Sequence, residues 1–189
     1  MPKGLLRSLC LVAAFLLVLP ALASADTLLS LFGGSTTFSA TGASESRTSV
    51  NYGGTLTFKK KVGVEVDFGY SNNIGGTDDL KTDNARTFMV NFIADAGPKH
   101  GRVQPYVSGG AGLIALKVAT VPGLFRVTSK YNDAGIDVGG GALVSSGGRM
   151  SYRLDARYFR DLDDVGVPFS DATVHVGFVR ITGGVVFRF

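Results

Sequence analysis

Charged side chains recur two positions apart in segments whose other residues are apolar or small. Glu65 and Asp67 lie in the stretch VGVEVDFGYS, and Arg153, Asp155 and Arg157 lie in MSYRLDARYF. Residues two apart point to the same face of a β-strand, so each group shares one face. Carboxylates and guanidiniums on facing strands form ion pairs, and pairing is what makes buried charges tolerable. The candidate network contains seven residues: Glu65, Asp67, Asp137, Arg153, Asp155, Arg157 and Arg180.

Residues suited to catalysis or metal binding are scarce. The only histidines are His100 and His175, and the only cysteine is Cys10. Two distant histidines without a carboxylate at ligand spacing do not form a metal site. The glycine runs at 109–112 and 139–141 lack the following helix and the Lys-Ser/Thr pair of a phosphate loop. We therefore predict no catalytic residue, no cofactor and no metal.

The first 25 residues have the pattern of a secretory signal peptide. Lys3 and Arg7 precede an apolar run at 9–19, and small residues at 23–25 provide a cleavage site. An uncleaved anchor is the alternative, but the run is short for a span of about 20 residues. We expect cleavage after Ala25 and a single domain at 26–189. Two of the four net positive charges lie in the leader, so the charge gives no argument for nucleic-acid binding.

The remaining chain alternates apolar and polar residues with a period of two. Val62, Val64 and Val66 oppose Glu65 and Asp67, and similar alternation is found at 50–58, 87–95, 133–144, 150–159 and 179–189. Two more segments, 28–40 and 103–117, have strand composition, but their faces cannot be assigned. The sequence thus predicts eight strands, and it has no apolar run long enough for a transmembrane helix after residue 25.

The links between these segments alternate in length. Longer polar links at 41–46, 72–83, 118–129 and 161–172 follow every odd strand, and tight links at 59–61, 96–102 and 145–149 follow every even one. This layout is typical of outer-membrane barrels. We predict an all-β fold, an eight-stranded antiparallel up-and-down transmembrane β-barrel. Its charged face lines the lumen, its apolar face meets lipid, and both termini lie in the periplasm.

Two of the longer links have unusual compositions. Val121, Leu124 and Phe125 make the third link apolar, which suggests a strand pair that projects above the membrane, a contact surface for a partner, or packing on neighbouring loops. The last link is acidic, and it either meets divalent cations of the lipopolysaccharide layer or is simply solvated.

Several segments resemble small outer-membrane barrels of the OmpA-like and OmpX/Ail-like families. The ending with Val185, Phe187 and Phe189 is similar to the C-terminal assembly signal of these barrels. The stretches PYVSGGAGL, DVGGGA and RLDARY resemble their fifth, sixth and seventh strands. The resemblance implies a location in the bacterial outer membrane. The implied partners are outer-membrane lipid, lipopolysaccharide and the barrel assembly machinery, and no surface ligand is specified.

The resemblance implies a non-enzymatic role in envelope integrity or surface interaction, including adhesion, through the extracellular loops. A narrow or gated pore for small solutes remains the first alternative, because lumen charges could also be hydrated. A lipid A-modifying enzyme is the second. In enzymes of the deacylase type a His-x-Ser arrangement lies on a late strand. The similar stretch here begins at His175, but Gly177 occupies the position of the serine nucleophile. Ser170 and Asp171 lie upstream, with nothing to fix them against that histidine.

Overall fold

The computed structural model describes residues 25–40, 47–72, 84–97, 101–120, 127–162, 165–166, 173–174 and 176–189. The predicted signal peptide, except its last residue, lies outside the described residues. So do both histidines and the apolar loop residues Val121, Leu124 and Phe125. Within the described ranges, no helix is long and apolar enough to cross a membrane.

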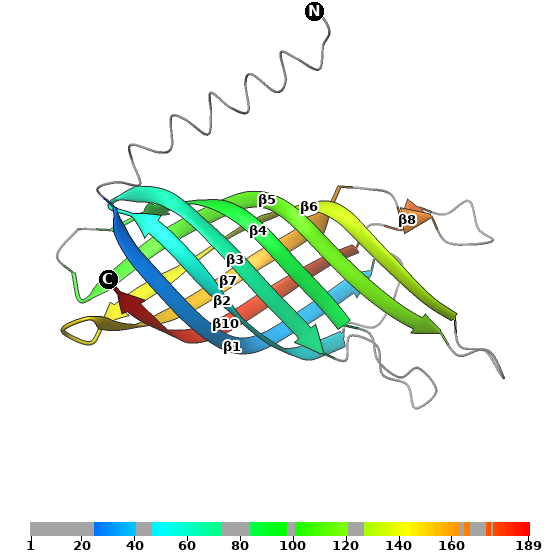
Figure 1. Ribbon diagram of the computed structural model, residues 1–189, viewed down its shortest axis with the longest axis horizontal. Helices are drawn as coiled ribbons and strands as arrows, with labels where there is room; N and C mark the ends of the chain where they lie inside the picture. The colour runs from blue at the N-terminus through cyan, green and yellow to red at the C-terminus, as the bar shows by residue number, and fades with distance from the viewer. Residues whose placement is uncertain are drawn as a thin grey trace, which may run out of the picture.

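Eight antiparallel strands close into a barrel in which each strand pairs with the next along the chain, and the last pairs with the first. This confirms the predicted fold (Figure 1). The barrel strands are β1 (Asp26–Ala40), β2 (Arg47–Lys59), β3 (Val62–Asn72), β4 (Asn84–Asp95), β5 (Val103–Thr120), β6 (Val127–Ser145), β7 (Met150–Asp161) and β10 (Val176–Arg188). Closure leaves no strand edge unpaired, which a membrane-embedded sheet requires.

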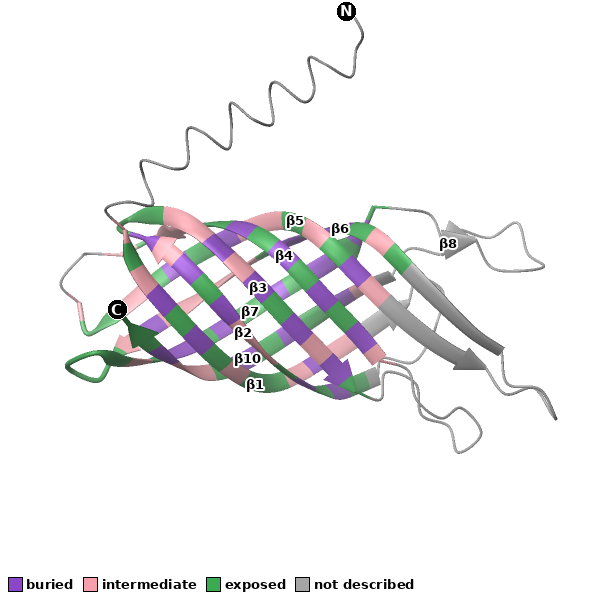
Figure 2. Ribbon diagram, in the orientation of Figure 1, coloured by how far each residue is buried: buried purple, intermediate pink, exposed green. Residues whose placement is uncertain are grey.

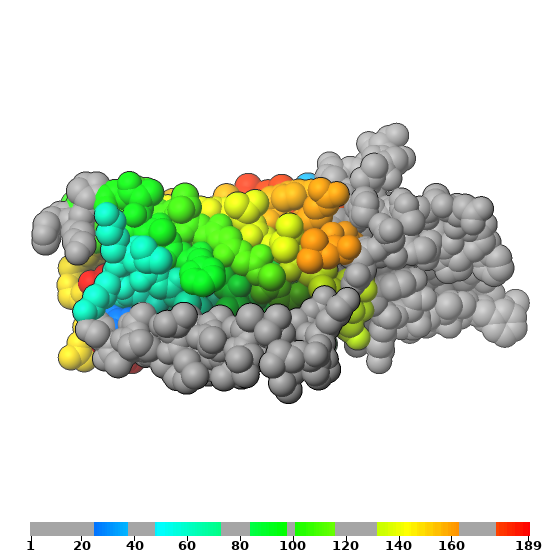
Figure 3. Space-filling model, turned by 90° about the horizontal axis from the view of Figure 1, so that it is seen from above, coloured from blue at the N-terminus to red at the C-terminus, as the bar shows by residue number. Residues whose placement is uncertain are grey.

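Burial alternates along each barrel strand, as the chequered colouring in Figure 2 shows. In β4, Thr87, Met89 and Asn91 are buried, whereas Phe88 and Phe92 are exposed. The exposed residues are mostly large and apolar. Figure 3 shows, on one face, how the atoms of neighbouring strands pack side by side in the barrel wall. The apolar face therefore points outward and the polar face inward, as predicted for a lipid-embedded barrel.

Both described chain ends lie at the same end of the barrel as the three tight links, and we call this the turn end (Figure 1). Phe189 donates its backbone N–H to Thr27 at 2.9 Å, which places the two ends of the chain side by side. In the link between β6 and β7, Gly147 and Gly148 have φ angles of +88° and +76°. Two successive positive φ values are rare for other residues and allow this reversal to be tight.

Two of the predicted links are wrong in extent. The link predicted at 118–129 is shorter, because β5 and β6 remain paired as far as Thr120 and Val127. The link predicted at 161–172 contains β8 (Val165–Gly166), which pairs with β9 (Thr173–Val174). In both places the backbone continues to satisfy its hydrogen bonds by strand pairing beyond the predicted strand ends.

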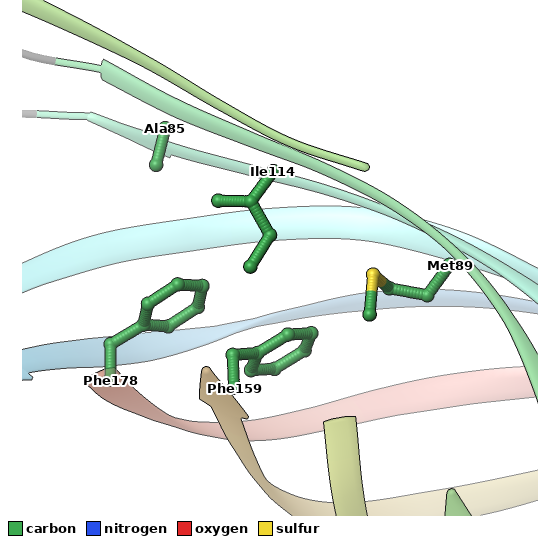
Figure 4. Packing of buried hydrophobic residues seen from close by; sticks show 5 residues of the cluster. All are labelled: Ala85, Met89, Ile114, Phe159 and Phe178. Atoms are coloured by element: carbon green, nitrogen blue, oxygen red, sulfur yellow. The ribbon is translucent and has the colours of Figure 1, made fainter. Parts of the chain in front are cut away.

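Two apolar clusters lie inside the barrel, one toward each end. The cluster nearer the long loops, the loop-end cluster, contains Ala85, Met89, Ile114, Phe159 and Phe178. Their side chains converge in Figure 4, where the rings of Phe159 and Phe178 stack at a centroid distance of 4.7 Å. The turn-end cluster contains Leu28, Ile93, Tyr106, Leu143 and Val186.

Candidate functional site: an ion-pair network across the lumen

The seven predicted network residues all point into the lumen and are at most 6% exposed. They come from β3, β6, β7 and β10, and β3 and β7 are four strands apart in the ring of eight. Those two strands therefore face each other across the lumen. Contacts between them must cross the interior of the barrel rather than follow its wall.

Glu65 is the centre of the network. Its carboxylate accepts from Arg153 Nη1 at 2.5 Å and from Arg157 Nη2 at 2.5 Å. Thr57 Oγ1, from the neighbouring strand β2, donates to it at 2.7 Å. Arg153 Nη2 donates to the same carboxylate at 3.2 Å. One carboxylate on β3 thus holds two guanidiniums from the opposite strand β7 and accepts four hydrogen bonds in all.

Arg157 contacts the three remaining carboxylates of the network. Its Nε donates to Asp155 at 2.8 Å, and its Nη1 lies 3.4 Å from Asp137 and 3.7 Å from Asp67. With its amide oriented to suit these neighbours, Asn91 donates to Asp137 at 2.6 Å and accepts from Arg157 at 2.5 Å. Among the four carboxylates, Asp137 has the longest contact to its closest guanidinium.

Asp67 and Arg180 form a nearly self-contained pair. Two parallel hydrogen bonds of 2.9 and 2.6 Å join the guanidinium to the carboxylate, the geometry that gives strong charge-assisted bonds. The guanidinium also lies between two aromatic rings, 4.9 Å from the centroid of Phe32 and 4.7 Å from that of Phe159. The aromatic faces shield the pair from water and add cation–π attraction.

Tyr106 belongs to the network but was not predicted from the sequence. Arg153 Nε donates to its hydroxyl at 2.6 Å, and the hydroxyl donates to Asp155. No alternation pattern marks Tyr106 as lumen-facing, because small and apolar residues occupy both faces of β5. An ion pair that was also not predicted joins Lys59 and Asp95 nearer the turn end, with the ammonium 5.8 Å from the Tyr106 ring centroid.

Two lumen-facing glycines make room for these long side chains. A Cβ atom on Gly69 would lie 2.5 Å from Arg180 Nη1 and 2.6 Å from Thr87 Oγ1. A Cβ on Gly141 would lie 2.6 Å from the Tyr106 hydroxyl. Both glycines thus allow close approach within the narrow lumen, and Gly141 belongs to one of the runs that resemble a phosphate loop in composition.

The network lies between the two apolar clusters. Phe159, in the loop-end cluster, follows Arg157 by two positions on β7, so both face inward and Phe159 is nearer the loops. Leu28, Ile93 and Leu143 of the turn-end cluster lie within three residues of the turn-end limits of their strands. Buried polar contacts in the middle of the lumen are therefore bounded by apolar side chains at both ends.

The chemistry of this site is ion pairing. Glu65, Asp67, Asp137 and Asp155 carry four formal negative charges against three positive charges on Arg153, Arg157 and Arg180, which leaves one negative charge in excess. Across the described part of the chain, no group of three or more His, Cys, Asp or Glu residues could hold a metal ion.

The three residues of the predicted assembly signal lie on the outer face of β10. Phe187 is 39% exposed and Phe189 is 77% exposed, while Val185 is partly covered. Phe187 pairs with Leu29 across the seam where the last strand meets the first. These side chains are thus available at the turn end, on the strand that closes the barrel.

Several solved structures are similar to this fold. Neisserial surface protein A aligns with a TM-score of 0.66 at 15% identity, over 86% of this chain and 97% of that chain. The attachment invasion locus protein Ail of Yersinia pestis gives 0.52 at 15% identity, over 87% and 99%. OprG of Pseudomonas aeruginosa gives 0.52 at 15% identity, over 87% and 96%. At these identities the likeness establishes the fold alone.

Comparison of the sequence with curated proteins found no match. A family model described as the outer membrane protein beta-barrel domain matches residues 10–189, which includes every barrel strand. The chain therefore belongs to the outer membrane protein β-barrel domain family, and its place is the bacterial outer membrane.

Proposed function

We propose that this protein is a non-enzymatic outer-membrane barrel with an occluded lumen, which serves envelope integrity or surface interaction through its extracellular loops. The observation that carries the proposal is the set of ion pairs that joins β3 to β7 across the lumen. In this proposal, direct contact between these side chains and an apolar cluster on each side block a continuous path of water through the lumen. Surface interaction is included because the fold is shared with an attachment invasion locus protein.

The proposal includes an orientation of the barrel in the outer membrane and a set of partners. The leader over residues 1–25 directs export and is removed, the turn end faces the periplasm with both termini, and the loops face outward. Val185, Phe187 and Phe189 are read by the barrel assembly machinery during insertion. Outer-membrane lipid surrounds the wall, and lipopolysaccharide contacts the loop end.

The two roles can be separated by complementing a deletion strain. One strain receives the wild-type barrel, and another receives a barrel in which the links at 41–46, 73–83, 121–126 and 163–175 are replaced by short turns. Leakage of an excluded fluorescent dye reports envelope integrity, and adherence of the cells to coated surfaces reports surface interaction. Rescue of the dye barrier by the trimmed barrel supports an integrity role. Loss of adherence with an intact barrier supports surface interaction, and no change in either readout without the protein contradicts both roles.

The enzymatic alternative is tested on the same strains. Lipid A extracted from cells with and without the protein should give identical mass spectra. A mass change that depends on the protein would show that it modifies lipid A and would overturn the non-enzymatic proposal.

A further inference from the structure

A pocket opens at the mouth of the lumen at the turn end, and we call it the mouth pocket. Its volume is about 370 Å³, which is within the usual range for small-molecule sites. The residues that line it are Asp26, Leu28, Lys59, Lys60, Asp95, Gln104 and Arg188. Arg188 pairs with Leu28, which is buried inside the barrel. Asp26 lies two positions from Leu28, and Arg188 lies two positions from the buried Val186, so both belong to the lumen-facing register.

The inner part of the mouth pocket ends at an ion pair. Lys59 and Asp95 contact each other, and their side chains are only 5% and 14% exposed. The Lys59 ammonium also lies 5.8 Å from the ring centroid of Tyr106, a buried member of the turn-end cluster. These two charges satisfy each other, so they do not require a ligand.

The outer part of the mouth pocket holds two charged side chains of a different kind. Asp26 and Arg188 are exposed, and among the described residues neither has an oppositely charged partner within 4.0 Å, each other included. A guanidinium presents a rigid fork of N–H donors that matches the oxygens of a carboxylate or a phosphate. Arg188 is therefore placed to hold an anionic group that enters the pocket.

The charge of this end of the barrel favours an anion over a neutral or cationic ligand. Three cations and two carboxylates line the mouth pocket, which leaves one positive charge in excess. The tight links at 59–61, 96–102 and 145–149 contain six Lys or Arg residues and no Asp or Glu. A cleft surrounded by charges of one sign concentrates ions of the opposite sign. Asp26 opposes an anion in the pocket, whereas Asp95 is neutralised by Lys59.

We infer that the mouth pocket binds a small multivalent anion that carries carboxylate or phosphate groups, with Arg188 as its main contact. Lys60 and Gln104 line the same pocket and carry further N–H donors. The anion comes from the aqueous phase at the turn end. The inference depends neither on the orientation of the barrel nor on the role given under the proposed function.

The test is isothermal titration calorimetry on the folded barrel in a non-ionic detergent at low salt. Citrate is the carboxylate probe and pyrophosphate is the phosphate probe. Arg188→Gln removes the proposed contact, and Asp26→Asn removes the opposing carboxylate. Arg149→Gln is the matched control, because it removes an exposed cation of the same end that does not line the pocket. Gel mobility with and without heating verifies that each variant is folded.

The wild type should bind at least one of the two probes, and the probe that binds more tightly identifies the anionic group. Arg188→Gln should weaken binding at least about tenfold, because charge-assisted hydrogen bonds are lost. Asp26→Asn should tighten binding about twofold, because a nearby like charge is removed. Arg149→Gln should weaken binding no more than about twofold, since salt and water screen a charge outside the pocket.

Three results would overturn the inference. The first is that neither probe binds to the wild type at millimolar concentration. The second is an equal loss in Arg149→Gln and Arg188→Gln, which would mean that the anion is attracted to the whole basic end rather than held in the pocket. The third is weaker binding in Asp26→Asn, as expected if the anion does not approach this carboxylate as a like charge. None of these results bears on whether the lumen is closed.

Discussion

Breaking the Asp67–Arg180 pair from one side should be strongly destabilising, and breaking it from both sides should be hardly worse. Each side chain is at most 1% exposed, and the two bonds between them measure 2.9 and 2.6 Å. Asp67→Asn or Arg180→Met leaves one buried charge without its partner. Each single variant should lose about 3–5 kcal/mol of unfolding free energy.

The magnitude follows from the isolation of this pair within the network. The two charge centres lie about 4 Å apart, for which an effective dielectric constant of about 20 gives an attraction of about 4 kcal/mol. Apart from this bond, Asp67 has only the 3.7 Å contact with Arg157. The double variant removes both charges together, so it should cost about as much as one single variant, with a coupling energy of about 3 kcal/mol.

Urea unfolding in lipid vesicles measures these free energies. The chain has no Trp, so circular dichroism and the heat-dependent shift in gel mobility are the appropriate probes. Arg86→Met is the matched control, since Arg86 is an exposed arginine 5.6 Å from the Tyr70 ring centroid and should cost about 1 kcal/mol or less. Mild, additive single effects with a coupling below about 0.5 kcal/mol would mean that water screens both charges, and the packed-lumen account would be refuted.

Four further predictions follow from the same structure. Asp137→Asn removes one negative charge at the carboxylate with the longest guanidinium contact, and it should lower the unfolding free energy by no more than about 1 kcal/mol. Glu65→Gln should lower it by about 3–5 kcal/mol in the same urea assay. The reverse order would contradict the assigned contacts. Ile181→Arg places a charge on the lipid face and should cost about 2–4 kcal/mol if the site lies near the bilayer midplane, with Ile181→Leu as the neutral control. Gly69→Ala should lower the urea midpoint of unfolding, because the added methyl group displaces the Arg180 guanidinium. An unchanged midpoint would show that the lumen has spare room. Phe189→Asp should slow insertion into the outer membrane in pulse-chase fractionation, and a wild-type rate would argue against its role in assembly.

The strand pattern and the sidedness of most strands were predictable, because alternation is a local property of the chain. Val66 and Asp67 are adjacent in a strand, so an apolar and a charged side chain point to opposite faces of the sheet. Once one face contacts lipid, the sheet must close into a barrel to pair all its backbone groups. The opposed positions of β3 and β7 also follow from consecutive pairing of eight strands. Together with the side-chain alternation, this consecutive pairing predicts that Glu65 on β3 and Arg153 on β7 meet across the lumen.

The partners within the lumen were less predictable. Tyr106 lies on a strand whose two faces have similar composition, and Phe32 lies on β1, which had the same ambiguity. The contact of Arg157 with Glu65 on the opposite strand depends on barrel stagger, which no local pattern encodes. The strand extensions as far as Thr120 and Val127 agree with the projecting strand pair that was one of three interpretations of the apolar third link, but the limits of the two strands were not predicted.

Electrical recording of the purified protein in a planar lipid bilayer tests most directly whether the lumen is closed. The ion pairs across β3 and β7 and the apolar clusters on either side predict that the wild-type barrel inserts without a stable open conductance. Glu65→Gln, which weakens two of those pairs at once, should increase brief openings over this silent background. A steady wild-type conductance whose ion selectivity changes in Glu65→Gln would contradict the account and identify the barrel as a hydrated pore.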